Sequence, residues 1–206
     1  MYEGEFGHVR RPTHTSTPYD ATRFEVCNQK WTALADEGLG AAVLNDCKYG
    51  VNVEGNSINL TLLKAALAPD MTADQGLHTF TYALYAWNGP LAASGVVREA
   101  YDLNVPATLA PGAVAGGKAV SLFGVSAPNI IIETVKPAED GSGDIVVRLY
   151  ESMRTATRCA LRTQLPVRAV VETDMLERRV KAVAFRDGVC TMAFRPFEIK
   201  TLRLHP

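Results

Sequence analysis

The sequence predicts an all-β fold, because a two-residue periodicity of apolar and polar side chains dominates it. In residues 57–62, Ile58, Leu60 and Leu62 alternate with polar residues, so that a strand here would bury one face. Residues 79–84 repeat the alternation with aromatic side chains. A run of short strands with few helical patterns is typical of β-sandwich domains.

Five more strands are expected in the C-terminal part, at 145–150, 167–172, 180–185, 190–194 and 197–204. Residues 186–188, Arg-Asp-Gly, predict a hairpin turn, because glycine readily takes a positive φ. The closing segment, residues 194–204, is expected to be purely structural, with Arg195 and Lys200 in solvent.

Two short helices are also expected. Ser94 is predicted to cap a helix that continues through Val97, Ala100 and Tyr101. It should end before Pro106, because the residue that precedes a proline avoids the helical region. A turn or two of helix is also expected within residues 31–36.

A domain boundary is predicted at the segment PGAVAGG, residues 111–117, which is small, flexible and free of large apolar side chains. It divides the chain into a first domain at 1–116 and a second at 117–206. The second is expected to contain six or seven short strands joined by regularly spaced turns, the pattern of a small β-sandwich.

Composition narrows the class of protein. With 206 residues and a formal net charge of −1, the chain has no field that would favour nucleic acid, and no segment suits a signal peptide or a membrane span. Its four cysteines, Cys27, Cys47, Cys159 and Cys190, form no C-x-x-C pair. They are interpreted as reduced, mostly buried thiols of a cytoplasmic protein.

Several segments resemble, in order, the C-terminal region of the zinc-dependent α-mannosidases of glycoside hydrolase family 38. They are FGHVRRPTH at 6–14, LNDCKYG at 44–50, DQGLHTFTYAL at 74–84 and FRPFEIKTL at 194–202. The resemblance covers nearly the whole chain. It implies that 1–116 is the C-terminal half of a large mutarotase-like β-sandwich, and that 117–206 is a small terminal β-sandwich.

The resemblance also implies the activity of a parent enzyme, which is hydrolysis of terminal α-linked mannose with retention of configuration. Such an enzyme uses two carboxyl groups, one as nucleophile and one as acid and base, and in this family also zinc. No position of the chain matches the family's nucleophile, acid/base or zinc ligands, so we assign no catalytic residue and no metal ligand. The implied partners are the catalytic barrel and helical domains of the same enzyme and an α-mannoside, with a homo-oligomer as a further option.

Three residues are candidates for substrate binding. The resemblance implies that Lys64 occupies the position of an arginine that approaches substrate in some members of the family. Lysine keeps the charge but loses the planar fork. Asp46 and Lys48 follow an apolar strand, where they either face a sugar or form a turn in which Asp46 binds backbone amides. For Asp74 and His78, on either side of Gly76, we expect a structural role in fixing a turn.

Two other classes of function remain open. The chain could be a free-standing carbohydrate-binding β-module, although Trp31, Tyr82, Tyr85 and Trp87 are expected to fill the core or an interdomain seam. It could also be a structural protein that mediates only oligomer contacts. As part of a larger enzyme, the isolated chain should be inactive. It should also be either poorly soluble or self-associating, because it would expose an unpaired sheet edge and an apolar face.

Overall fold

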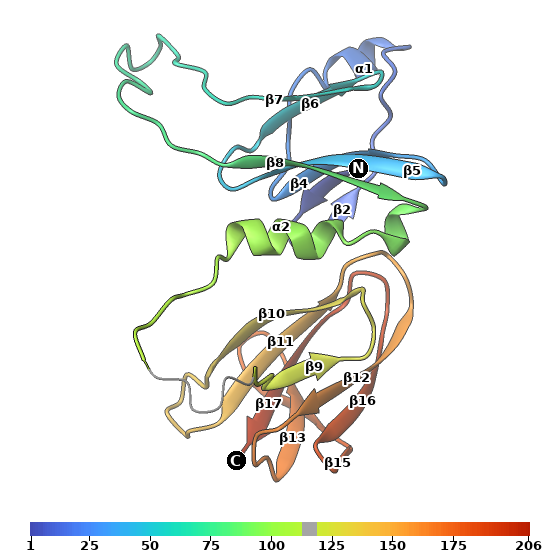
Figure 1. Cartoon of the computed structure of the whole chain (residues 1–206), viewed down its shortest axis with the longest axis vertical. Coiled ribbons are helices and arrows are strands. Elements are labelled where there is room, and N and C mark those ends of the chain that lie inside the picture. Colours follow the sequence, from blue (N-terminus) through green and yellow to red (C-terminus); the bar gives the residue numbers. More distant parts are fainter. Residues whose placement is uncertain (113–118) are drawn as a thin grey trace. The chain divides into compact units, whose positions relative to one another are not determined.

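The computed structural model describes residues 1–112 and 119–206, which form two units, Met1–Thr108 and Leu109–Pro206 (Figure 1). The described residues are mostly β, in four antiparallel sheets, which confirms the predicted fold class. The predicted boundary at 116/117 lies outside the described residues.

Unit 1 combines two sheets with short helices. Its five-stranded sheet has the order β2-β1-β4-β5-β8, and its three-stranded sheet has the order β3-β6-β7. The elements are β1 (Tyr2–Gly4), β2 (Gly7–Val9), α1 (Pro18–Ala21), β3 (Val26–Cys27), β4 (Trp31–Ala35), β5 (Leu39–Asn45), β6 (Gly50–Glu54), β7 (Ser57–Leu60), β8 (Tyr82–Asn88), the 3-10 helix η1 (Leu91–Ala93) and α2 (Val96–Asn104).

Helix α2 packs against β4 and β5 of the larger sheet through Val96, Val97 and Ala100, which are all buried. It ends at Asn104, as the sequence predicts. The predicted cap is wrong, because Gly95 is the N-cap and the Ser94 hydroxyl donates to the carbonyl of Leu91 at 2.7 Å. Among the described residues, no helix is long and apolar enough to cross a membrane.

Two sequence-based predictions in unit 1 need correction. The helical turns expected at 31–36 are instead strand β4, which lies between β1 and β5 and is buried at Trp31, Thr32 and Ala33. A strand that is covered on both faces loses the alternation that distinguishes it from a helix. The strand expected at 79–84 is displaced and occupies Tyr82–Asn88.

Unit 2 is a sandwich of two antiparallel sheets. One has the order β10-β11-β17-β13-β14 and the other β15-β16-β12-β9. The strands are β9 (Phe123–Val125), β10 (Ile130–Pro137), β11 (Ile145–Glu151), β12 (Thr157–Thr163), β13 (Ala169–Thr173), β14 (Arg179–Val183), β15 (Phe185–Arg186), β16 (Val189–Phe194) and β17 (Ile199–His205).

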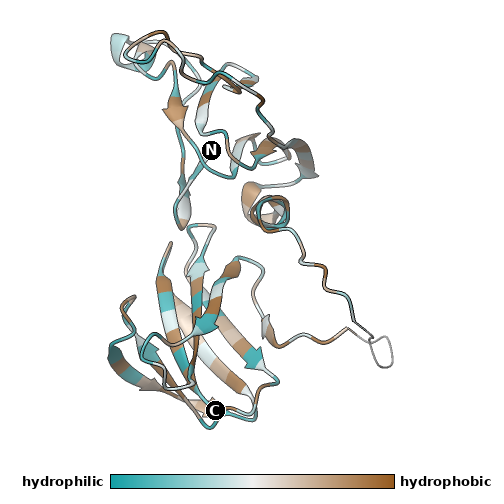
Figure 2. Cartoon of the chain, turned by 90° about the vertical axis from the view of Figure 1, so that its left-hand side faces the viewer, coloured by the Kyte–Doolittle hydropathy of each residue, from teal (hydrophilic) through white to brown (hydrophobic). Residues whose placement is uncertain are grey.

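The nine described strands of unit 2 exceed the six or seven that were predicted. Their inward side chains, from both sheets, form one continuous core that includes Ile130, Val147, Leu149, Leu161 and Leu202. Figure 2 shows hydrophobic and hydrophilic bands alternating along these strands. The predicted turn at 186–188 is confirmed, since Asp187 and Gly188 both have positive φ, 50° and 75°, between the paired strands β15 and β16.

Glu151 lies at one end of this sandwich and is fully buried, with 0% of the residue exposed. Its carboxylate holds several connections together through hydrogen bonds. It accepts hydrogen bonds from Asn129 Nδ2 at 2.9 Å and from the backbone amides of Met153, Thr155 and Phe197 at 2.7, 3.1 and 3.0 Å. These donors precede β10, follow β11 and precede β17. A single buried charge therefore joins three connections, and its lone pairs are well supplied with donors.

Two predictions about burial are also corrected. Lys200 is 8% exposed rather than in solvent, because its ammonium group reaches Glu172 at 3.1 Å and Glu198 at 3.5 Å. The prediction for Arg195 is confirmed, with an 84% exposed side chain. Of the four cysteines, none of which is in a disulfide, Cys159 and Cys190 are buried, whereas Cys27 and Cys47 are exposed.

We expect Glu151→Ala to lower the free energy of unfolding by roughly 3 kcal/mol, because it leaves several buried donors without an acceptor. Urea unfolding followed by circular dichroism measures the change. Glu139→Ala is the matched control, since the Glu139 side chain is 82% exposed in its ion pair with Lys136 and should change stability by less than about 0.5 kcal/mol. Equal effects of the two variants would contradict the role assigned to Glu151.

Candidate functional site

Unit 1 contains a polar cavity of about 240 Å³ between the segment that precedes β3 and strand β6. Four parts of the chain line it, namely β1, the loop after β2, α1 with the residues that follow it, and β6. The lining residues are Tyr2, Pro12, Thr13, His14, Thr15, Asp20, Ala21, Arg23, Phe24, Asn52, Val53 and Glu54.

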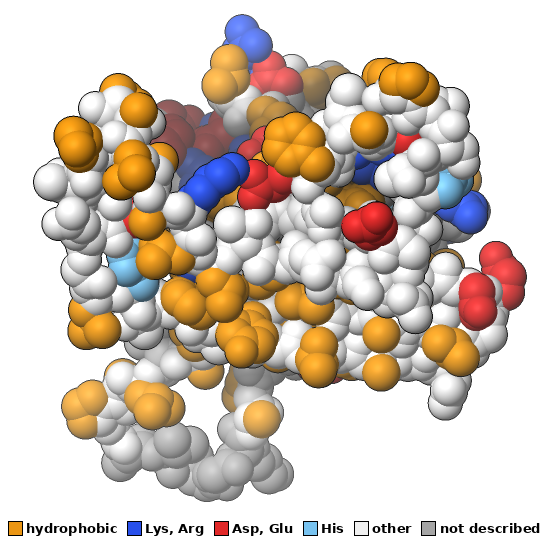
Figure 3. Space-filling model, turned by 90° about the horizontal axis from the view of Figure 1, so that it is seen from above, with side chains coloured by type: hydrophobic (Ala, Val, Ile, Leu, Met, Phe, Trp, Pro, Cys, Tyr) orange, Lys and Arg blue, Asp and Glu red, His pale blue; other side chains and the backbone are white. Residues whose placement is uncertain are grey.

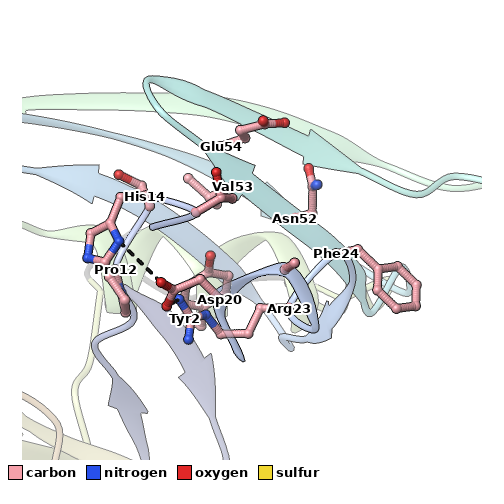
Figure 4. A pocket seen from close by; sticks show the side chains of 12 residues that line it. Tyr2, Pro12, His14, Asp20, Arg23, Phe24, Asn52, Val53 and Glu54 are labelled. Atoms are coloured by element: carbon pink, nitrogen blue, oxygen red, sulfur yellow. Dashed lines mark hydrogen bonds and ion pairs between the residues drawn. The ribbon is translucent and has the colours of Figure 1, made fainter. Parts of the chain in front are cut away.

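Asp20 lies in the wall of this cavity, between His14 and Arg23 (Figure 4). It is fixed by a capping box, in which Thr17 Oγ1 accepts from the Asp20 amide at 3.2 Å and Asp20 Oδ2 accepts from the Thr17 amide at 2.9 Å. Pro18 follows Thr17 at the start of α1, where its fixed φ suits a helix. The local sequence thus sets the position of the carboxylate.

Three side chains surround the Asp20 carboxylate, which is only 7% exposed. The Arg23 guanidinium donates to Oδ1, the Thr17 hydroxyl donates to Oδ2, and His14 Nδ1 lies 3.5 Å from Oδ2. The hydrogen bonds from Arg23 and then from Thr17 lower the pKa of Asp20 to about 2. At neutral pH the cavity therefore always contains an ionised carboxylate.

Lys64 lies in the long connection between β7 and β8, and its side chain is 68% exposed. Its ammonium group donates to Glu25 Oε2 at 2.7 Å, while the Thr61 hydroxyl donates to Oε1 at the same distance. These bonds, the one from Lys64 first, lower the pKa of Glu25. Gly50 permits this arrangement, since a Cβ there would lie 2.6 Å from Glu25 Oε1.

Asp46 and Lys48 lie in the short connection between β5 and β6, which packs against the start of β8. Asp46 Oδ2 accepts from the Thr81 amide at 2.9 Å, and the Asp46 amide donates to the Thr81 carbonyl at 3.1 Å. Lys48 Nζ lies 4.8 Å from the centroid of the Phe80 ring, a cation–π geometry. The Asp46 carboxylate also raises the pKa of the Cys47 thiol.

Asp74 and His78 belong to the connection that precedes β8. A ring nitrogen of His78, Nε2, lies 2.7 Å from the carbonyl oxygen of Asp74 across Gly76, whose φ is +123°. The Asp74 carboxylate accepts from the Ala65 amide at 3.0 Å. Asp74 and His78 are therefore in contact through the backbone and not through paired side chains.

The five predicted residues do not form one site. Lys64 pairs with Glu25, Asp46 and Lys48 contact the residues before β8, and His78 contacts the backbone of Asp74. Among the described residues, no hydrogen bond or ion pair joins Lys64 to Asp46 or Lys48. The cavity around Asp20 was not predicted from the sequence. The Thr17-Pro18-x-Asp20 spacing is a local signal for it, since this spacing marks a helix N-terminus with an acidic residue in the first turn.

The described residues do not include a cluster of side chains that could bind a metal ion. Within residues 1–112 and 119–206, no group of three His, Cys, Asp or Glu side chains could hold a metal ion. Around Asp20 the nearest charged partner is a guanidinium, which is not a zinc ligand. The donor sets that the structure describes therefore do not fit the zinc of the resembling enzymes.

Two family models match the chain, and both describe the same enzyme family. Residues 1–72 match the glycosyl hydrolases family 38 C-terminal domain, and residues 129–202 match the glycosyl hydrolases family 38 C-terminal β-sandwich domain. Together they cover parts of both units. The chain belongs to glycoside hydrolase family 38, of which it contains C-terminal β domains.

Known relatives agree with this assignment. The chain is 43% identical to human α-mannosidase 2C1 and 39% identical to α-mannosidase G of Dictyostelium discoideum, in each case over 98% of its length. It spans only about a fifth of each relative, 20% and 19%. The crystal structure of an α-mannosidase from Enterococcus faecalis has the same fold, with a TM-score of 0.78 at 23% identity, over 98% of this chain and 24% of that one.

Acidification should weaken the hydrogen bonds of Asp20 that hold α1 in place. Because the folded pKa of Asp20 is depressed, its stabilising contacts are present above its ordinary pKa of 3.8 and are lost as the pH falls towards about 2. We expect amide hydrogen exchange in α1 to accelerate across this window relative to exchange in unit 2. In Asp20→Asn, exchange in α1 should already be fast at neutral pH. An α1 protection that is the same in both proteins would contradict the assignment.

Proposed function

We propose that this chain is the C-terminal β portion of a retaining, metal-dependent α-mannosidase that hydrolyses terminal α-linked mannose. The observation that carries the proposal is its similarity, along 98% of its length, to proteins named α-mannosidase at 39% to 43% identity. Nucleophile, acid/base and metal ligands would belong to the other four-fifths of such an enzyme. This chain would support and complete the sugar site.

The outer face of the larger sheet in unit 1 supports a docking role. Leu39 on β5 and Tyr82 and Leu84 on β8 are 61%, 58% and 84% exposed. Val43 pairs with Leu84 and Ala41 with Ala86, so that these side chains form one apolar surface on the face opposite α2. An exposed apolar face of this kind is typical of a protein–protein interaction surface.

The edge of the same sheet adds to that surface. Among the described residues, β8 pairs only with β5, so its other side presents free backbone groups that another strand could bind. In the connection before β8, Leu67, Met71 and Leu77 are also exposed, at 75%, 75% and 97%. Figure 3 shows several groups of hydrophobic side chains on the face of the molecule seen from above. We infer that the preceding domains of the enzyme cover this surface.

Within this arrangement, Lys64, Asp46 and Lys48 are proposed to lie near the substrate. The support is that the ammonium group of Lys64 is 68% exposed although it is paired with Glu25. An exposed ammonium can donate to a sugar hydroxyl without breaking its ion pair, since it has three donors. Asp74 and His78 are proposed to shape the same connection. The four free cysteines support a cytoplasmic location.

Complementation tests the proposal directly. We expect the chain alone to leave 4-nitrophenyl α-D-mannopyranoside intact. Co-expression with the preceding part of human α-mannosidase 2C1, truncated where the similarity begins, should give turnover that a chelator abolishes. Turnover by the chain alone, or a stable complex of the two that stays inactive, would overturn the proposal.

The docking surface has its own test in Leu84→Glu. We expect this change to reduce the restored turnover at least tenfold, because docking would bury an unpaired carboxylate. It should also reduce self-association of the isolated chain in sedimentation velocity. Leu176→Glu is the matched control, since Leu176 is a 73% exposed leucine in a turn of unit 2. If both variants behave alike, the surface around β8 is not the docking site.

A further inference from the structure

The four-stranded sheet of unit 2, in the order β15-β16-β12-β9, has one face that points away from the core (Figure 1). Its inward residues, among them Cys159, Leu161 and Met192, belong to the buried core. Successive side chains of a strand point to opposite faces, so the residues between these point outwards. The four strands contain three arginines and no Asp, Glu or Lys. The outward face therefore carries charge of one sign.

The register of the strands places the three arginines on this one face. Arg158 and Arg162 lie four residues apart on β12, and Arg162 is opposite Val189 of β16. Val189 is in turn opposite Arg186 of β15. At ~3.3 Å per residue and ~4.8 Å between strands, the arginine backbones lie ~13 Å apart along β12 and ~10 Å apart across the sheet.

These arginines have little neutralisation from the protein itself. Arg158 and Arg162 are exposed and form no ion pair with any residue that the structure describes. Arg186 lies 3.5 Å from Asp187, but the two side chains are 92% and 88% exposed, and such a pair is weak. On the other sheet of the unit, by contrast, Arg203 pairs with two aspartates. The outward face is thus a set of cations without internal partners.

The chemistry of the face favours carboxylates as its partner groups. All three cations are arginines, and a planar guanidinium binds a carboxylate through two parallel hydrogen bonds. The side chains beside them are small, such as Gly124, Ala160 and Ala193, so another protein segment can approach the sheet closely.

Other anionic partners fit this face less well. The aromatic residues of these strands, Phe123, Phe185 and Phe194, pack against the core and not outwards. The face therefore lacks the stacking platform that single-stranded nucleic acid uses, and it lacks the large apolar side chains that enter a lipid surface.

The absence of large apolar side chains also indicates the kind of contact. Permanent interfaces are more hydrophobic, whereas charged surfaces steer reversible association and select partners by complementary charge. This face differs in that respect from the apolar surface around β8 in unit 1. A partner that binds and leaves is therefore expected here.

We propose that the outward face of the β15-β16-β12-β9 sheet binds an acidic segment of a separate protein. Carboxylates of that segment pair with Arg158, Arg162 and Arg186. The inference does not rest on the proposed α-mannosidase role, because it concerns a different unit of the chain and its test involves no mannoside.

The test uses the full 206-residue chain and fluorescein-labelled poly-L-glutamate, with fluorescence anisotropy as the readout. We expect saturable binding that weakens as sodium chloride is added, because the Debye length falls to ~10 Å at 0.1 M. Oligodeoxythymidine and phosphatidylserine vesicles are titrated in parallel. Both are expected to bind more weakly than poly-L-glutamate.

Two double variants with the same change in charge locate the binding face. One is Arg158→Gln with Arg162→Gln, and the control is Arg178→Gln with Arg179→Gln, at the β14 edge of the other sheet. We expect the first to weaken binding by about tenfold, since each exposed ion pair contributes a few-fold, and the control to stay within about twofold. Because all four side chains are exposed, both variants should keep the thermal unfolding midpoint of the parent chain.

Three results would overturn the proposal. They are the absence of saturable binding of poly-L-glutamate, equal losses in the two double variants, and tighter binding of the oligonucleotide or the vesicles. Each is measured without mannoside turnover, so failure here leaves the proposed function untouched.

Discussion

A β-sheet with an apolar face is stable in water only if something covers that face, and the two units meet this requirement differently. In unit 2 two sheets cover each other, and their inward side chains form one core. In unit 1 α2 covers one face of the five-stranded sheet, while Leu39, Tyr82 and Leu84 on the other face stay exposed. Unit 2 is thus internally complete, whereas the sheet of unit 1 presents a surface suited to further protein.

Buried carboxylates fix the local backbone at three connections of the chain. Glu151 accepts from three backbone amides at one end of the sandwich, and Asp20 closes the capping box of α1. In unit 1, Glu3 accepts from the Lys30 amide at 2.6 Å and pairs with its ammonium group at 2.8 Å, which joins β1 to the start of β4. Burial raises the pKa of Glu3 even so, because desolvation outweighs these contacts.

Both units also contain ion pairs between charged side chains. In unit 2, Arg203 pairs with Asp140 and Asp144 across neighbouring strands and loops. In unit 1, Lys64 keeps a 68% exposed side chain although its ammonium group is paired with Glu25.

Strand periodicity and turn chemistry are local, so the sequence by itself determined the all-β class, the end of α2 at Asn104 and the Asp187-Gly188 turn. It could not determine β4, because a strand covered on both faces has no alternation. The burial of Lys200 depended on Glu172, which is 28 residues away in the chain. Only the tertiary structure brought Tyr2, His14, Asp20 and Asn52 around one cavity, since these residues meet through strand pairing that no local pattern encodes.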